Sequence, residues 1–157
     1  MFATTIPLAV VMRGFQSNNG HCIEGARNQA NMMRVLVCGG REFANRQILN
    51  QALDRLHQEH GVTLIISGGA RGADTRAEWW AKAEGVPCDV YQADWTGLGR
   101  KAGPIRNQRM LDEGKPDLVV AFPGGRGTAD MMRRAREAGV EVIEVTYDAI
   151  SPAYRSR

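Results

Sequence analysis

The stretch "DLVVAFPGGRGTADMM", residues 117–132, contains a strand, a glycine-rich turn and the start of a helix. Its apolar run, 117–122, has the length of a strand buried on both faces of a sheet. The turn PGGRGT follows at once, and a helical pattern then continues to Gly139, a typical helix stop. A buried strand that leads through a glycine turn into a helix is half of a βαβ unit, so this stretch predicts a parallel sheet.

The same order of elements repeats through most of the chain. Right-handed crossovers between such strands predict a Rossmann-like doubly wound α/β fold of about five strands in the order 3-2-1-4-5, with helices on both faces of the sheet. We expect strands at 34–40, 62–69, 87–93, 117–122 and 140–145, helices at 45–61, 73–85, 104–114 and 127–139, and a loop at 94–103.

The 157 residues suit one domain, which the pattern places at 33–150. Residues 1–32 lack the pattern and are interpreted as an N-terminal extension, either an early start ahead of Met32 or Met33 or a poorly ordered tail. A secretion signal is disfavoured, because no positive residue precedes the short apolar piece and no clear cleavage site follows it. Residues 151–157 are interpreted as a C-terminal tail.

Composition and charge disfavour several classes of protein. No apolar run approaches the roughly 20 residues of a membrane span. Cys22, Cys38 and Cys88 are odd in number and lack metal-ligand spacing, which favours a reduced, cytoplasmic setting. No metal-ligand cluster is visible in the sequence, and we expect neither a metal nor a cofactor. The net charge of +3, the pI near 9.0 and the 6% aromatic content suit a small anionic ligand better than single-stranded nucleic acid.

Three glycine-rich loops follow predicted strands: CGGREF, SGGARGAD and PGGRGTAD. The carboxyl ends of parallel strands share one edge of the sheet, where doubly wound folds bind ligands in the crevice between the central strands. Glycine permits close approach of the backbone, and the N-terminus of the following helix favours an anion. The predicted ligand-binding residues in these loops are Gly39, Gly40, Arg41, Ser67, Gly68, Gly69, Arg71, Gly72, Pro123, Gly124, Gly125, Arg126, Gly127 and Thr128.

Charged residues after the strands complete the candidate site. Arg106 and Arg109 are three residues apart on one predicted helix, so both are expected to reach the crevice and bind phosphate. Asp74 and Asp130 fall near helix starts, where they either stabilise the helix dipole or bind ribose and perform acid–base chemistry. Thr128 caps its helix or contacts phosphate. The arginines further along that helix are interpreted as a solvated face: Arg133, Arg134 and Arg136.

Taken together, "VCGGREF", "SGGARGAD", "GPIRNQRML" and "AFPGGRGTADM" resemble the YspA-like branch of the SLOG superfamily, over nearly the whole domain. The superfamily includes the lonely-guy phosphoribohydrolases and the DNA-processing protein DprA. The resemblance implies a Rossmann-like fold and a nucleotide-like ligand. Lonely-guy-like proteins generally dimerise, which suggests a homodimer; the adjacent Trp79 and Trp80 cannot both face one core, so one of them offers surface for it.

The chain departs from the lonely-guy pattern at two positions. Those enzymes carry PGGxGTxxE, and Met131 stands where their catalytic glutamate lies; Asp130 precedes it by about 100° of helix rotation. Their Arg-Lys-x-x-Met stretch is matched by "RNQRM", which keeps Arg106 and Met110 but has Asn107 in place of lysine.

The sequence therefore favours a nucleotide-binding or nucleotide-sensing domain whose ligand is a nucleoside phosphate or an ADP-ribose-like derivative. The alternative is a phosphoribohydrolase that cuts the N-glycosidic bond of nucleoside 5′-monophosphates, with Asp130, Arg106 and Asp74 as its candidate catalytic residues. Single-stranded DNA binding is the least favoured reading, because the chain has no basic stripe.

Overall fold

A computed structural model describes residues 33–146, so the predicted extension 1–32 and the tail 151–157 lie outside the described residues. The strands within this range are β1 (Met33–Cys38), β2 (Val62–Ser67), β3 (Cys88–Val90), β4 (Leu118–Ala121) and β5 (Glu141–Glu144). The helices are α1 (Arg46–His60), α2 (Ala73–Glu84), α3 (Trp95–Leu98), α4 (Ala102–Asp112) and α5 (Arg126–Glu137), with a 3₁₀ turn, η1, at Gly99–Lys101.

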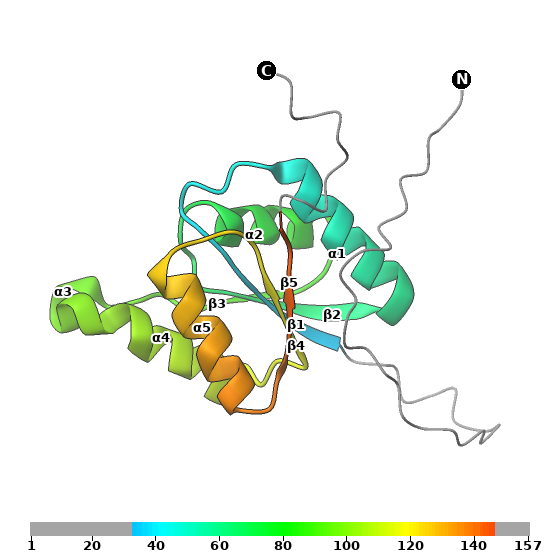
Figure 1. Ribbon diagram of the computed structural model, residues 1–157. Helices are drawn as coiled ribbons and strands as arrows, with labels where there is room; N and C mark the ends of the chain where they lie inside the picture. The colour runs from blue at the N-terminus through cyan, green and yellow to red at the C-terminus, as the bar shows by residue number, and fades with distance from the viewer. Residues whose placement is uncertain (1–32, 147–157) are drawn as a thin grey trace, which may run out of the picture.

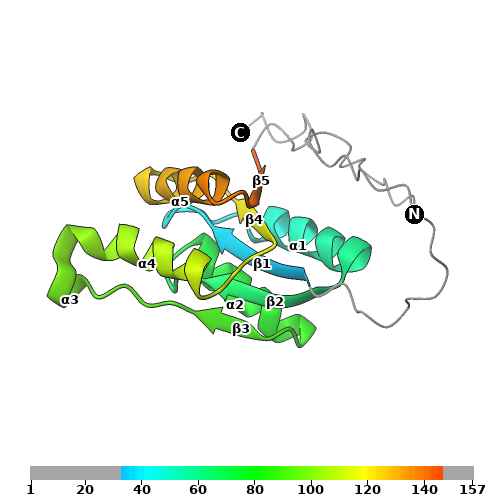
Figure 2. The same ribbon diagram turned by 90° about the horizontal axis from the view of Figure 1, so that it is seen from below.

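The five strands form one parallel sheet in the order β3-β2-β1-β4-β5, as predicted. Chain order reverses at β1, because the chain runs outward from β1 through β2 to β3 and then returns to β4 on the other side. Figure 2 shows the strands side by side in this order, with α4 and α5 in front of them. The loops after β1 and β4 therefore lie next to each other at the carboxyl edge, where the switch in strand order opens a crevice.

Helices cover both faces of the sheet, and each face has its own core. Figure 1 shows α1 and α2 on one side of the sheet and α4 and α5 on the other. Val35 and Val37 of β1 point into the α1–α2 core, whereas Leu36 points into the α4–α5 core with Met110 of α4 and Met131 of α5. Alternate residues of one central strand thus hold two helical layers, as expected for a doubly wound fold.

The segment after β3 differs from the prediction. The third strand is three residues long rather than the seven expected at 87–93, and the predicted loop 94–103 contains α3, η1 and the first residues of α4. Asp94 caps α3 by accepting a hydrogen bond from the Gly97 N–H group at 2.8 Å. This capped turn carries the chain outward beyond the edge of the sheet before α4 returns along it, so α4 brings its own side chains to the crevice (Figure 1).

The two adjacent tryptophans of α2 divide as predicted. Trp80 is 4% exposed and donates its indole N–H to Asp54 of α1 at 2.7 Å, so the buried ring keeps its hydrogen bond. Trp79 is 56% exposed. Its place in a dimer interface stays a prediction.

Candidate ligand-binding site

A cavity of about 620 Å³ lies at the carboxyl edge, between the loops after β1 and β4, in the predicted crevice. A second cavity of about 410 Å³ adjoins it beside the ends of β2 and β3. We call these cavity 1 and cavity 2. Both are lined by Arg41, Ala70, Trp95 and Arg106, so they share one boundary. Each volume falls in the range that small-molecule sites of proteins occupy.

Four of the eight glycines in the three loops pack one loop against another. A Cβ atom on Gly39 would lie 2.5 Å from the Cβ of Ala73, and one on Gly124 would lie 2.6 Å from the Gly40 nitrogen. The Gly40 N–H group donates to the Pro123 carbonyl at 2.9 Å, which joins the β1 and β4 loops directly. Gly72 has a φ of +92°, and a side chain there would overlap the Gly40 carbonyl oxygen. These glycines build the edge, and only some of them line the cavities.

The start of α5 is the part of the edge that is open to a ligand. A Cβ atom on Gly125 or Gly127 would meet nothing within 4 Å, and both residues line cavity 1. Gly125 is the N-cap and supplies no side chain to the helix end. Within residues 33–146 the N–H groups of Arg126, Gly127 and Thr128 have no hydrogen-bond partner, and Arg126 has no ion-pair partner. Unpaired N–H groups at a helix N-terminus, beside a free guanidinium, form a site suited to an anion.

Of the two roles predicted for Thr128, capping of the helix is wrong. It is buried and lines cavity 1, but it lies in the third position of α5 and caps nothing, because the helix already begins at Arg126. The predicted start of this helix at 127 was one residue late. The hydroxyl lies close to Gly124, since a Cβ atom on that glycine would overlap the Thr128 oxygen. The site therefore keeps Thr128 as part of its wall.

Two consecutive residues of α4 connect the loops across the crevice. Arg106 donates from Nη1 to the Gly68 carbonyl after β2, and from Nε to the Asn107 side-chain oxygen at 3.1 Å. Asn107, which is 4% exposed, donates from Nδ2 to the Gly127 carbonyl at 3.2 Å and to Asp130 at 3.0 Å. The Arg106–Asn107 pair is thus a brace between the β2–α2 loop and α5, and it holds the Arg106 guanidinium at the boundary of the two cavities.

Asp74 is a buried carboxylate behind this brace. It is 5% exposed and accepts hydrogen bonds from the N–H groups of Gly68 at 3.1 Å and Ala70 at 3.3 Å. Burial raises the pKa of Asp74 to about 6, although those two N–H groups and the Arg106 charge act in the opposite direction. Burial also lowers the pKa of Arg106 from its ordinary value, while Asp74 opposes that shift. Asp74 lines cavity 1, and its role in binding or catalysis stays a prediction.

Asp130 lies in a different environment. Two arginines of its own helix contact it, Arg133 at 2.8 Å and Arg134 at 2.8 Å, in addition to Asn107. Partial burial acts against ionisation, but the hydrogen bonds from Arg134, Asn107 and Arg133 outweigh it, and the pKa of Asp130 lies below its ordinary value. Asp130 lines cavity 1 as an ion-paired carboxylate whose free lone pairs are few.

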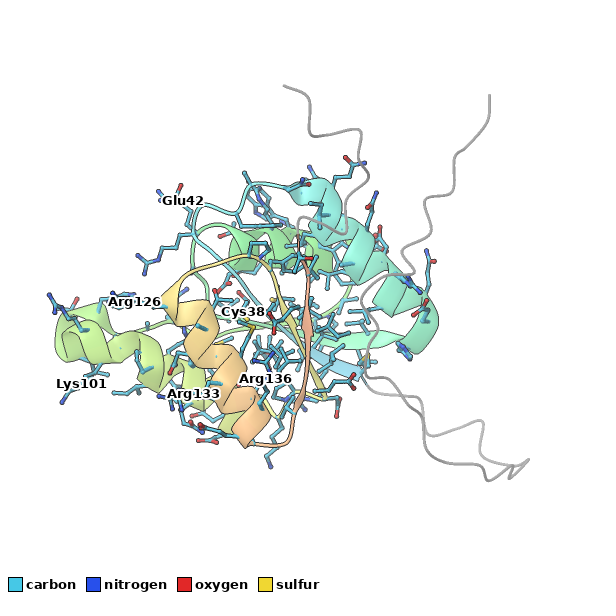
Figure 3. The ribbon with its side chains drawn as sticks, viewed as in Figure 1. Cys38, Glu42, Lys101, Arg126, Arg133 and Arg136 are labelled. Atoms are coloured by element: carbon cyan, nitrogen blue, oxygen red, sulfur yellow. The ribbon has the colours of Figure 1, made fainter. Side chains whose placement is uncertain are left out.

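The solvated face predicted for the arginines of α5 is therefore wrong for Arg134. Its side chain is 23% exposed and bridges Asp130 and the side-chain oxygen of Gln108, the latter at 2.8 Å. It links α5 to α4 and is part of the interface between the two helices. Arg133 and Arg136 do lie on an exposed face, where they pair with Glu137 and Glu144 (Figure 3).

Five of the predicted ligand-binding residues line neither cavity. Arg109 points away from the crevice, where it pairs with Glu113 at 3.1 Å and lies over the Tyr91 ring. Three residues of helix leave the two side chains about 60° apart around the axis and about 4.5 Å apart along it, so Arg109 lies further along α4 than Arg106, beside Glu113 and Tyr91. Ser67 donates to Glu78 at 2.6 Å instead of facing a ligand. The other three lie within the packed loops: Gly72, Pro123 and Gly124.

The cavities are also lined by residues that the sequence analysis did not assign to the site. Gly103, Asn107 and Met110 follow one another at spacings of four and three residues, which is one face of α4, and this spacing was the signal that could have identified them. Cys38, at the end of β1 (labelled in Figure 3), lines cavity 1 and belongs to the same buried cluster as Met131, so the two form the floor of the cavity. Burial raises the pKa of the Cys38 thiol, so it contributes apolar surface to the cavity. Arg100 also lines cavity 1, and its place after the third predicted strand put it on this edge of the sheet, whereas no sequence pattern distinguishes Gln92 from other surface residues.

Between Met33 and Thr146 no group of three or more His, Cys, Asp or Glu side chains is arranged to hold a metal ion. None of the helices in this part of the chain has the length and the apolar character that a membrane span needs.

Comparison with known proteins agrees with this geometry. Residues 33–97 match the family YAcAr, described as the YspA, cpYpsA-related SLOG family. The chain is also 42% identical over 120 residues to the Gene 61 protein of Mycobacterium phage D29, an alignment that covers 71% of this chain and 95% of that protein. This protein belongs to the YspA, cpYpsA-related SLOG family. The resemblance read from the four motifs is thereby confirmed.

Among solved structures, the DNA processing protein A (DprA) of Streptococcus pneumoniae has the same fold. The two share a TM-score of 0.59 at 19% sequence identity, and the match covers 78% of this chain. This SLOG protein spans about half of the length of DprA, 54% of that chain. The likeness confirms a Rossmann-like α/β fold.

Proposed function

We propose that this SLOG protein binds a nucleotide or a nucleotide-derived ligand in cavity 1, with a phosphate group at the start of α5. The observation that carries the proposal is the N-terminus of α5 at the cavity: three N–H groups and the Arg126 guanidinium that have no partner among residues 33–146, and the open surface beside Gly125. Partial positive charge at the helix end and the Arg126 charge add at one point, which favours a phosphate dianion.

The rest of cavity 1 suits the other parts of a nucleotide. Its floor contains Cys38, Met110 and Met131, which offer apolar and polarisable contacts for a planar base. Trp95, 50% exposed, stands at the rim with the Arg41 guanidinium 5.4 Å from its ring centre. Membership of the SLOG family supports a function related to nucleotides or nucleic acids, and the cavity volume of about 620 Å³ suits a small-molecule ligand.

Titration calorimetry with nucleoside 5′-monophosphates and diphosphates of all four bases, and with ADP-ribose, tests the proposal. We expect saturable binding of at least one compound and a ten-fold or larger loss of affinity in Arg126→Ala. Arg136→Ala is the matched control, because it removes the same charge from an exposed position at the far end of the same helix (Figure 3). Absence of binding at millimolar ligand, or equal losses in both variants, would refute the proposal.

A second candidate function, hydrolysis of the N-glycosidic bond of a nucleoside 5′-monophosphate, is favoured by one observation. Asp74 lines cavity 1 beside Arg106, and its pKa of about 6 lets it exchange a proton near neutral pH. Asp130 is a poorer acid–base group, because its arginine partners keep it ionised. Chromatography of nucleoside monophosphates incubated with the protein decides between binding and cleavage: release of free base above a heat-treated control supports the hydrolase, and its absence supports binding alone.

A further inference from the structure

Cavity 2 is not used by the function proposed above, and its chemistry differs from that of cavity 1. Three arginines line it, Arg41, Arg71 and Arg106, and no aspartate or glutamate is among its lining residues. Cavity 1, in contrast, has two carboxylates, Asp74 and Asp130, and the apolar floor. We infer that cavity 2 binds a second anionic group of the same ligand, so that the ligand is a nucleotide carrying a further phosphate or a phosphate-linked sugar. This inference rests on the proposed function.

The shared boundary allows one molecule to occupy both cavities. Ala70 and the side chains of Arg41, Trp95 and Arg106 line both of them. Arg106 is held at this boundary by the Gly68 carbonyl on one side and by Asn107 on the other. Its position is therefore set by the protein before any ligand arrives, and a bridging phosphate that crosses the boundary meets an oriented guanidinium.

Arg71 is the arginine of cavity 2 best placed to change partner. It pairs with Glu42, and the two side chains are 75% and 87% exposed. An ion pair in such an exposed position contributes little, because water screens it, so a phosphate can take the place of Glu42 at little cost. Figure 3 shows Glu42 on the outer side of the β1–α1 loop, turned away from Cys38 and the floor of cavity 1.

Gln92 supplies the neutral contact of cavity 2. A Cβ atom on Gly69, which has a φ of +64°, would lie 2.6 Å from the Gln92 side-chain nitrogen, so the amide lies directly over the β2–α2 loop. An amide both donates and accepts, which suits the hydroxyl groups of a sugar. Cavity 2 thus has cations for a phosphate and an amide for a sugar attached to it.

The test compares ligands that differ only in the second anionic group. Calorimetry of each monophosphate and diphosphate pair, and of ADP-ribose, is performed on the wild-type chain, Arg71→Ala, Glu42→Gln and Gln92→Ala, with Arg136→Ala as the charge-matched control. We expect the diphosphate of the preferred base to bind at least ten-fold more tightly than its monophosphate. Arg71→Ala is expected to remove most of that difference, whereas Glu42→Gln preserves or increases it.

The arms of the experiment separate the two sources of the second group. If a bare phosphate suffices, ADP and ADP-ribose bind equally and Gln92→Ala has no effect; if the sugar contributes, ADP-ribose binds more tightly and Gln92→Ala removes that gain alone. Equal affinity for monophosphates, diphosphates and ADP-ribose overturns the inference while leaving the proposed function intact. The inference is also overturned if Arg71→Ala and Arg136→Ala weaken the binding of every ligand by the same factor. Failure of every compound to bind overturns the proposed function as well.

Discussion

The loops SGGARGAD, residues 67–74, and PGGRGTAD, residues 123–130, are similar in sequence but have different roles. In the first, a Cβ atom on Gly68 or Gly72 would overlap other parts of the protein, and the N–H group of Ala73 at the start of α2 donates to the Gly40 carbonyl. In the second, Gly125 and Gly127 face open space and the first N–H groups of α5 are unpaired within the described residues. One loop builds the edge of the sheet, and the other leaves it open to a ligand.

Asp74 and Asp130, the last residues of the two loops, differ in environment for a related reason. Asp74 is the second residue of α2 and reaches back to the N–H groups of Gly68 and Ala70. Asp130 is the fifth residue of α5, because that helix begins earlier relative to its loop, and it is reached by the arginines one turn later. A shift of three residues in where the helix starts therefore decides whether the carboxylate is buried behind the loop or ion-paired beside the cavity.

The largest expected change in stability follows from the difference in free space around the glycines of the two loops. Gly72→Ala is predicted to destabilise the fold by about 2–4 kcal/mol, because it combines positive φ with overlap on the β1–α1 loop. Gly127→Ala is predicted to leave stability unchanged or to raise it by up to about 1 kcal/mol, because Gly127 is a helical residue of α5, where alanine is preferred, and its surroundings are open. Urea unfolding of both variants measures this, and equal losses would contradict the division between the loops.

The next effect concerns the two acids. The pKa of Asp74 is raised from 3.8 to about 6 on folding, so the folded state binds the extra proton between these values and stability falls as pH rises through that window. The loss amounts to at most about 3 kcal/mol. Asp74→Asn is predicted to remove this decline in urea unfolding between pH 4 and pH 7.

Asp130→Asn is the matched variant, because the pKa of Asp130 shifts in the opposite direction to that of Asp74. Its pKa is lowered in the folded state, so the contribution of this carboxylate is present at neutral pH and is lost on acidification. The decline attributed to Asp74 is predicted to persist in Asp130→Asn. If the two variants gave the same pH profile, the contrast between the acids would be wrong.

The smallest of the three effects tests the brace that joins the loops. Asn107→Leu removes the partners of the Arg106 Nε–H group and the Gly127 carbonyl, which is predicted to cost about 1–3 kcal/mol of stability. Asn107→Asp retains the acceptor for Arg106 but places a second negative charge beside Asp130. We expect the NMR signal of the Arg106 Nε–H group to broaden or shift toward that of free arginine in Asn107→Leu and to stay dispersed in Asn107→Asp. An unchanged signal in both variants would show that Asn107 does not position Arg106.

Much of the fold could be read from the sequence because its signals are local. Strand 117–122, followed by PGG and a helix, needs only hydrophobic pattern and turn chemistry, and the strand order follows from assigning the alternating strands and helices to a Rossmann-like doubly wound fold. The failures lie after β3, where the polar segment 94–103 has weak periodicity and the Asp94 cap starts a short helix. Arg109 was misassigned because helix spacing gives relative angles between side chains and not the direction in which the crevice lies.

The sequence by itself determined the Rossmann-like sheet, the single edge on which the glycine loops gather and membership of the SLOG family. Only the tertiary structure decided which glycines face a ligand and which face another loop, because that depends on contacts between segments about 30 to 80 residues apart, such as Gly40 with Gly72 and Pro123. It also decided the state of the two acids. Burial of Asp74 and the arginine partners of Asp130 arise from packing, and packing sets the electrostatic environment of each carboxylate.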